Sequence, residues 1–533
     1  MPLTDSTARA GAREQVQAAA RRTHCPQRDK PWVLVVAILG SSLAFIEGSV
    51  VNLALPAIQS GFSTTFSGVQ WVLNAYLLVL GAFMLVGGSL GDRHGLRRIF
   101  VLGTAIFGAG AAACAFAPTL AWLVAARLVQ GFGGALLVPA SLALIGSHFD
   151  DEERGRAIGT WAGASALTTA IGPVLGGWLV DQWGWQAVFL MVAPLAAATV
   201  AMTLWRVPAT RPLRDERPDY AGALLLAGSL VFLILALVDT GPAWRRIAFA
   251  LAALLAGAAF VRREHRYRHP MLPLALFRSR SFSGANLMTL LLYFALTGVL
   301  FFLPFNLIQV QGWSTTAAGA ALLPFTVIMG FGSTFAGDLI RKLDSRRILT
   351  IGPMVTAAGF FALAFPGTDS SYAAGFLPGI IFIGIGMTLS VAPLTTVVMN
   401  SVSDRQAGLA SGVNNTAARL AGVFAIAVLT AVAVASFSGN VEERLRAEGI
   451  PDALTGQLVD RAAALAELSA PEGSSPQITA RVDAAVDQAY VRTFRWLVLL
   501  CGMLAVGSGL IAWRCLPADR PKDDPEEGTS PAS

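Results

Sequence analysis

The sequence predicts an all-α membrane protein with fourteen transmembrane helices, and two observations carry this prediction. First, 54% of the 533 residues are hydrophobic and only 14% are charged. A soluble domain has about 25% charged residues, so lipid must cover much of the surface. Second, apolar stretches long enough to cross a bilayer, which takes about 20 residues, recur along the chain.

We expect spans at 32–56, 69–90, 99–117, 120–142, 157–180, 186–205, 220–238, 245–261, 283–308, 317–340, 347–366, 373–398, 407–435 and 493–514.

The basic residues fix the expected direction of these helices. With the N-terminus in the cytoplasm, 29 of the 39 Lys and Arg fall in cytoplasmic segments, whereas the short outer loops hold only Arg245 and Arg246. This asymmetry follows the positive-inside rule. The asymmetry predicts an even number of spans with both termini in the cytoplasm. It also indicates that the net charge of +6 serves binding to an anionic membrane surface rather than to a nucleic acid.

An internal repeat divides the chain. Residues 88–98 read GSLGDRHGLRR and residues 337–347 read GDLIRKLDSRR, and each follows an expected span on the cytoplasmic side. Repeats in corresponding halves are typical of alternating-access transporters. The expected organisation is a cytoplasmic tail (1–31), a six-helix bundle (32–205), a linker with two extra helices (206–280), a second six-helix bundle (281–515) and a disordered tail (516–533). The second bundle includes an extracytoplasmic loop at 436–490.

Four segments carry a family resemblance. They are GSLGDRHGLRR at 88–98, FIEGSVVNLALP at 45–56, RLVQGFGGALLVP at 127–139 and GPVLGG at 172–177. Together they resemble the major facilitator superfamily and its branch of fourteen-helix drug:proton antiporters. The resemblance implies the major-facilitator fold, with two six-helix bundles and two extra helices between them, and a monomer in the bacterial cytoplasmic membrane. It also implies proton-coupled export of small amphipathic compounds.

Glu47 is the only carboxylate well inside an expected span. A carboxylate in hydrocarbon is costly, so we expect it to be functional or paired. At 1.5 Å per residue, Glu47 and Arg127 both lie ~12–13 Å below the outer boundary, so they can meet. Burial favours the protonated acid and Arg127 favours the carboxylate, a balance that suits a proton carrier. A permanent ion pair that only fixes helix packing is the alternative.

Two further motifs are expected to control conformational change. The resemblance implies that Asp92 pairs with arginine and with a helix N-terminus of the other half, and that this contact holds the cytoplasmic side closed as a latch. Alternatively, the arginines only set the orientation of the helices in the membrane. The latch residues are Gly88, Gly91, Asp92, Arg93, Gly95, Arg97 and Arg98. Gly172, Pro173, Gly176 and Gly177 form the motif that marks antiporters in the family, although kinks and small faces are also common in ordinary membrane helices.

Polar and aromatic residues within the spans are candidates for the substrate cavity, or alternatively for hydrogen bonds between helices. They are Asn52, Gln70, Trp71, Asn74, Tyr76, Gln130, Trp161, Asn286, Asn414, Asn415 and Arg419.

The sequence also argues against several kinds of chemistry. None of the three lysines follows glycine, so a phosphate-binding Gly-Lys-Ser/Thr loop is absent and ATP is not the expected fuel. The four cysteines lack framework or metal-ligand spacing, so no metal or disulfide is expected. We therefore expect no enzyme activity and no cofactor, with the proton gradient as energy source. A dedicated exporter of one metabolite (an antibiotic, a siderophore or a lipid precursor) and a non-transporting sensor or scaffold remain alternatives.

Overall fold

A computed structural model describes residues 27–517 except 150, 210–218, 240, 268–269, 271, 273, 343, 403–406, 463–464, 466–467 and 472–473. Every regular element of this described part is helical. In chain order these are α2 (Lys30–Phe62), α3 (Phe66–His94), α4 (Leu96–Ala115), α5 (Leu120–His148), α6 (Asp151–Trp183), α7 (Gln186–Arg206), α8 (Tyr220–Val238), α9 (Ala243–Arg266), η1 (Leu274–Arg278), α10 (Arg280–Phe305), η2 (Asn306–Val310), α11 (Thr315–Ala321), α12 (Leu323–Lys342), α13 (Ser345–Ala362), η3 (Tyr372–Phe376), α14 (Leu377–Asn400), α15 (Ala407–Ala447), α16 (Asp452–Asp460) and α17 (Pro476–Cys515).

Twelve helical segments of the described chain are long and apolar enough to cross a membrane. The two other expected spans, 157–180 and 347–366, correspond to α6 and α13. Arg346 and Arg347 lower the mean hydropathy of the 18-residue α13, and α6 begins with a run of charged residues. A multi-helix membrane bundle is therefore established, whereas the count of fourteen stays a prediction.

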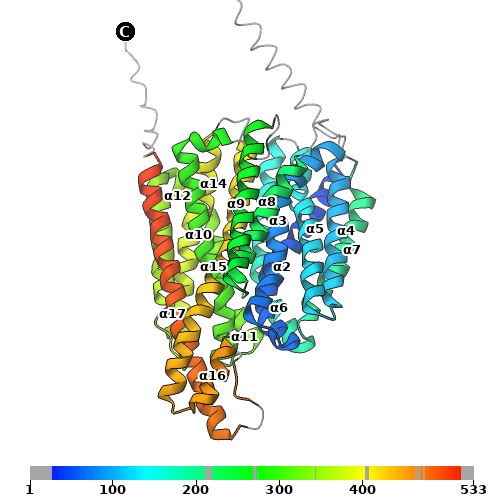
Figure 1. Ribbon diagram of the computed structural model, residues 1–533. Coiled ribbons are helices and arrows are strands. Elements are labelled where there is room, and N and C mark those ends of the chain that lie inside the picture. Colours follow the sequence, from blue (N-terminus) through cyan, green and yellow to red (C-terminus); the bar gives the residue numbers. More distant parts are fainter. Residues whose placement is uncertain are drawn as a thin grey trace, which may run out of the picture.

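The helices form two groups with a hairpin between them (Figure 1). The N-terminal half contains α2 to α7, the C-terminal half contains α10 to α17, and α8 and α9 lie in front of the junction. Leu230 and Ile234 of α8 share one hydrophobic cluster with Leu78 of α3 and Val423 of α15. The hairpin therefore covers the seam where the two halves meet.

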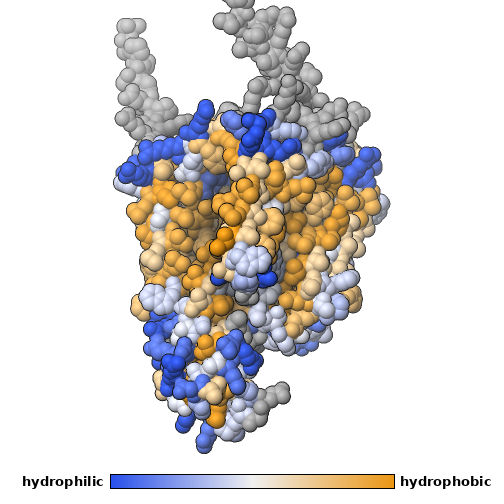
Figure 2. Space-filling view, in the orientation of Figure 1, coloured by the Kyte–Doolittle hydropathy of each residue, from blue (hydrophilic) through white to orange (hydrophobic). Residues whose placement is uncertain are grey.

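On the face shown in Figure 2, an apolar belt crosses the middle of the molecule and polar residues gather at its two ends. Large apolar side chains are exposed on the described part of the protein, among them Leu254 and Leu255 of α9. Contact with lipid makes such a surface favourable. The surface pattern thus agrees with a multi-pass membrane protein.

One end of the bundle is sealed by a hydrophobic core that belongs to both halves. Phe66, at the start of α3, is fully buried, and its ring centroid lies 5.3 Å from those of Phe301 and Phe302 and 4.5 Å from that of Phe305. These three rings end α10 in the opposite half. At the other end, each half has its own hydrophobic cluster, and no cluster of the described residues joins them there. The sealed end is the predicted outer end.

The segment expected as an extracytoplasmic loop, 436–490, contains more regular structure than predicted. α15 and α17 continue beyond the bundle as helices of 41 and 40 residues, and with α16 they form the projection at the bottom of Figure 1. Leu445, Leu458 and Val482 are fully buried within this projection. Helix extension is favourable there because the three segments bury apolar side chains against one another.

Candidate functional site

Glu47 of α2 and Arg127 of α5 form an ion pair in the interior of the N-terminal half. The Arg127 guanidinium donates to Glu47 Oε1 at 2.6 Å, and both side chains are fully buried. The sequence predicts that Glu47 and Arg127 lie at the same depth in the membrane, and the structure brings them into contact. In a low-dielectric interior, removal of either partner would leave a buried charge without compensation.

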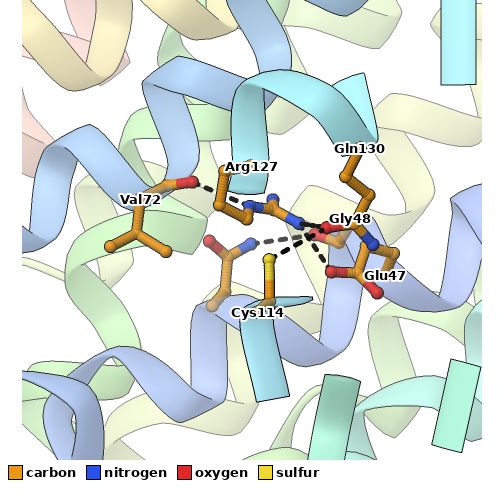
Figure 3. Close-up of polar contacts among 7 residues, drawn as sticks. Glu47, Gly48, Val72, Cys114, Arg127 and Gln130 are labelled. Atoms are coloured by element: carbon orange, nitrogen blue, oxygen red, sulfur yellow. Dashed lines mark hydrogen bonds and ion pairs between the residues drawn. The ribbon is translucent and has the colours of Figure 1, made fainter. Parts of the chain in front are cut away.

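Arg127 is held from several directions (Figure 3). Its Nε donates to the Val72 carbonyl at 2.9 Å, and its Nη1 also donates to Gln130 Oε1 at 2.8 Å. The guanidinium stacks over the Tyr76 ring at 4.3 Å. These contacts come from α3 and α5, so the position of Arg127 depends on how closely those helices approach.

A glycine makes that approach possible. A Cβ on Gly131 of α5 would lie 2.6 Å from the Tyr76 carbonyl oxygen of α3, which is shorter than any real contact. Backbone contact at this point brings the Val72 carbonyl within reach of Arg127. Gly131 thus serves the site through close packing of α5 on α3.

The polar network around the pair is incomplete. Glu47 Oε2, Arg127 Nη2 and Gln130 Nε2 are buried and have no hydrogen-bond partner among the described residues. An unsatisfied buried polar atom costs about 1–3 kcal/mol. The site therefore keeps hydrogen-bonding capacity that a proton, water or ligand can use.

The expected latch lies where α3 ends and α4 begins. Gly95 joins the two helices with φ +93°, a conformation that favours glycine. Gly91 is close-packed, because an added Cβ would lie 2.9 Å from Leu96, whereas Gly88 has more room. Arg97 donates to the Leu204 carbonyl of α7 at 2.6 Å, which ties it to its own half. Arg93 is half-buried and Arg98 is exposed, and the Asp92 side chain lies outside the described residues.

The Gly-Pro-Gly-Gly motif packs α6 against the other half and against α2. A Cβ on Gly177 would lie 2.4 Å from the Thr315 carbonyl oxygen, and a Cβ on Gly319 would lie 2.2 Å from the Pro173 carbonyl oxygen. A Cβ on Gly176 would overlap Val50 of α2. Gly172, like the other three motif residues, is buried. The motif therefore places α6 in backbone contact with α11 near the sealed end.

Asp181 is a residue of this contact that the sequence did not reveal. Its carboxylate accepts from Thr315 N at 3.0 Å and from Thr316 N at 2.7 Å, and also from Thr316 Oγ1. Asp181 ends α6 and the threonines begin α11, so these bonds connect the two halves at the sealed end. Asp181 is an exposed acid near a helix end, which in a sequence normally indicates a solvated surface. Its hydrogen-bond partners lie more than 130 positions further along the chain, so local sequence pattern does not reveal them. Only its place four residues after GPVLGG hinted at this contact.

Among the cavity candidates, Tyr76 and Gln130 belong to the ion-pair cluster. Gln70 and Asn74 are fully buried on α3, and their amide atoms have no partner in the described chain. Arg419 of α15 is half-buried.

The remaining cavity candidates have local partners or surface positions. Trp161 donates to Ser41 Oγ, Asn52 to the Gly48 carbonyl and Asn286 to the Phe282 carbonyl, while Asn414 accepts from Thr289. Trp71 packs at the α8 seam and Asn415 is exposed. For these residues the structure gives interhelical, local or surface contacts rather than one common cavity.

Comparison with known proteins identifies the family. The family model described as Major Facilitator Superfamily matches residues 37–426, so the chain belongs to this superfamily. It is 31% identical over 520 residues to the tetracenomycin C resistance and export protein of Streptomyces glaucescens, covering 95% of each chain. It is 34% identical to the multidrug resistance protein Stp of Mycobacterium tuberculosis, covering 79% of this chain and 78% of the relative.

Solved structures agree on the fold. A bacterial homologue of the human lysosomal transporter Spinster, in an inward-facing and occupied conformation, superposes with a TM-score of 0.65 at 17% identity, covering 92% of this chain and 98% of that one. A D-xylose-proton symporter gives 0.60 at 15% identity, with 91% and 98% covered. Fold and family therefore point to a membrane transporter rather than an enzyme.

The buried pair predicts a specific pattern of stability. Arg127→Met should lower the free energy of unfolding by about 3–5 kcal/mol, because it leaves Glu47 buried without its cation. The double variant Glu47→Gln/Arg127→Met should recover most of this loss. Thermal unfolding of the detergent-solubilised protein measures both. An Arg127→Met variant as stable as the parent would contradict the interpretation.

The interhelical bonds of Asp181 predict a change in accessibility. Thr430 of α15 is almost fully buried and serves as the reporter position for the sealed end. In a background without native cysteines, Thr430→Cys should react slowly with a membrane-impermeant maleimide added from outside. Asp181→Asn should raise that rate several-fold, because the carboxylate loses acceptor bonds that close the sealed end. Asp239→Asn is the matched control, since Asp239 pairs with Arg245 within the α8–α9 hairpin. Equal rates in both variants would exclude a closing role for Asp181.

Proposed function

We propose that this protein exports small amphipathic compounds, including drugs and antibiotics, across the bacterial cytoplasmic membrane in exchange for protons. The observation that carries the proposal is the fully buried Glu47–Arg127 ion pair. Intramembrane carboxylates are characteristic of proton relays. The resistance and export functions in the names of the similar proteins support the direction of transport and the substrate class.

Glu47 has the features that a proton carrier needs. Arg127 stabilises its carboxylate, whereas the surrounding low-dielectric interior favours the neutral acid. Its Oε2 atom has no partner in the described chain, so it can take a proton while Oε1 keeps its contact with Arg127. Protonation would weaken the ion pair and free the Arg127 guanidinium, which links proton binding to a rearrangement of α2 and α5.

We further propose that transport proceeds by rocking of the two halves. A shared core at one end and separate cores at the other support a state that is closed outside and accessible from the cytoplasm. In this proposal the chain has fourteen spans and two cytoplasmic termini, and it acts as a monomer. The latch at 88–98 closes the inner side when the outer side is open. No cofactor or nucleic-acid partner takes part, and the proton gradient supplies the energy.

A dedicated exporter of one metabolite is the second candidate. The Streptomyces relative, whose name refers to export of a single antibiotic, matches nearly the whole chain, which favours this reading. A resistance screen separates the two: protection against one compound indicates a dedicated exporter, and protection against several unrelated compounds indicates a multidrug pump. Absence of flux with every compound in proteoliposomes would instead favour a non-transporting sensor or scaffold.

The proton role of Glu47 predicts the effect of one substitution. Glu47→Gln should abolish energised efflux of lipophilic dyes, because the amide cannot take up and release a proton. Efflux is measured from loaded cells with a panel of anionic, neutral and cationic dyes. Glu443→Gln is the control, since Glu443 is an exposed acid paired with Arg492 outside the membrane bundle. Efflux by Glu47→Gln at the parent rate would disprove the proton role.

A further inference from the structure

The interior of the protein carries more positive than negative charge. Three charged side chains lie deep within the predicted spans: Glu47, Arg127 and Arg419. Arg419 lies ~18 Å along α15 from its first residue, Ala407, at 1.5 Å per residue, which is near the middle of a hydrocarbon core ~30 Å thick. Because Glu47 and Arg127 neutralise each other, Arg419 leaves one uncompensated positive charge.

Arg419 lies where α15 of the C-terminal half meets α3 of the N-terminal half. A Cβ on Gly81 of α3 would lie 3.5 Å from the Arg419 Cβ, so the two helices are adjacent at this level. The Arg419 guanidinium lies within electrostatic reach of the hydroxyls of Tyr76 of α3 and Tyr293 of α10, which come from opposite halves. The Arg419 guanidinium is therefore near the interior tyrosines rather than out among the lipids.

No described residue compensates the charge of Arg419. Its side chain is half-buried, and it forms no hydrogen bond or ion pair within the part of the chain that the structure describes. The nearby Tyr76 hydroxyl is buried and also lacks a hydrogen-bond partner there. A cation in the membrane interior is costly unless it is solvated or paired, so this position favours an anionic ligand.

We propose that Arg419 binds an acidic group of the transported compound, such as a carboxylate, sulfonate or phenolate, and thereby makes the protein prefer anionic amphipathic substrates over lipophilic cations. The guanidinium provides a planar set of donors that matches an oxyanion, and the Tyr76 hydroxyl supplies a further donor. This assignment rests on the proposed transport function and specifies its substrate class.

The charge balance also explains what the site should reject. Glu47 is already engaged by Arg127, and the C-terminal half offers no carboxylate deep within its predicted spans. A lipophilic cation at this level would meet Arg419 without a compensating anion, and like charges at short range repel. Selectivity would therefore follow the charge of the substrate more than its shape.

Two dyes with the same xanthene ring system test the proposal: fluorescein, an anion at neutral pH, and rhodamine 123, a cation. Binding to the purified full-length protein in detergent is measured by fluorescence anisotropy. The parent should bind fluorescein at least tenfold more tightly than rhodamine 123. Arg419→Gln should weaken fluorescein binding about tenfold and leave rhodamine 123 binding unchanged or stronger. Arg419→Lys should fall between, because it keeps the charge but loses the planar donors.

Arg495→Gln is the matched control, because Arg495 donates to the Ala364 carbonyl at the predicted outer end and should not affect either dye. Thermal unfolding establishes that each variant is folded, and the lysine variant keeps the test informative should the glutamine variant unfold. The proposal is overturned if Arg419→Gln binds fluorescein as tightly as the parent does. It is also overturned if the parent does not bind fluorescein, or binds it more weakly than rhodamine 123.

The binding assay separates this inference from the proposed function. Charge-selective binding through Arg419 without any efflux would disprove the transport function and leave the anion site standing. Efflux that does not depend on Arg419 for fluorescein would disprove the anion site and leave the transport function standing.

Discussion

The structure depends on an ion pair that lies entirely out of contact with solvent. Glu47 and Arg127 meet at 2.6 Å with no exposed surface, and neither charge would be tolerable alone at this depth. The pair therefore constrains α2, α3 and α5 together, through the Val72 carbonyl, Gln130 and the Tyr76 ring. Glu47 Oε2 and Arg127 Nη2 lack partners in the described chain, so the proposed proton uptake would act at this contact.

The sealed end is a balance between opposing interactions. Phe66 against the three phenylalanines of α10, and Asp181 against the first turn of α11, hold the halves together. Gln70 and Asn74 of α3 and Thr430 of α15 are buried there without hydrogen-bond partners in the described chain, which favours separation and hydration. In the proposed rocking cycle, such opposing terms would reduce the free-energy difference between the closed and the open conformation.

The sequence predicted what depends on composition and depth, and missed what depends on contacts between distant segments. Twelve of the fourteen expected spans and the approach of Glu47 to Arg127 follow from hydropathy, the basic-residue pattern and the helical rise. The bonds of Asp181 and the length of α15 and α17 depend on tertiary contacts that local pattern does not encode. The expected spans at α6 and α13 are not among the twelve membrane-length helices of the described chain; α6 begins with charged residues, and α13 has two arginines in its first turn. Arg97, expected at the latch, donates to the Leu204 carbonyl of its own half, a contact between distant segments that local pattern does not encode.

The proposed antiport requires Glu47 to carry the proton that is exchanged for substrate. The most direct measurement is proton movement in proteoliposomes that contain a pH-sensitive dye, driven only by a substrate gradient. The parent should move protons opposite to the substrate, and Glu47→Gln should exchange labelled substrate across the membrane while moving no protons. Proton movement by Glu47→Gln at the parent rate, or substrate transport by the parent without any proton movement, would contradict the account.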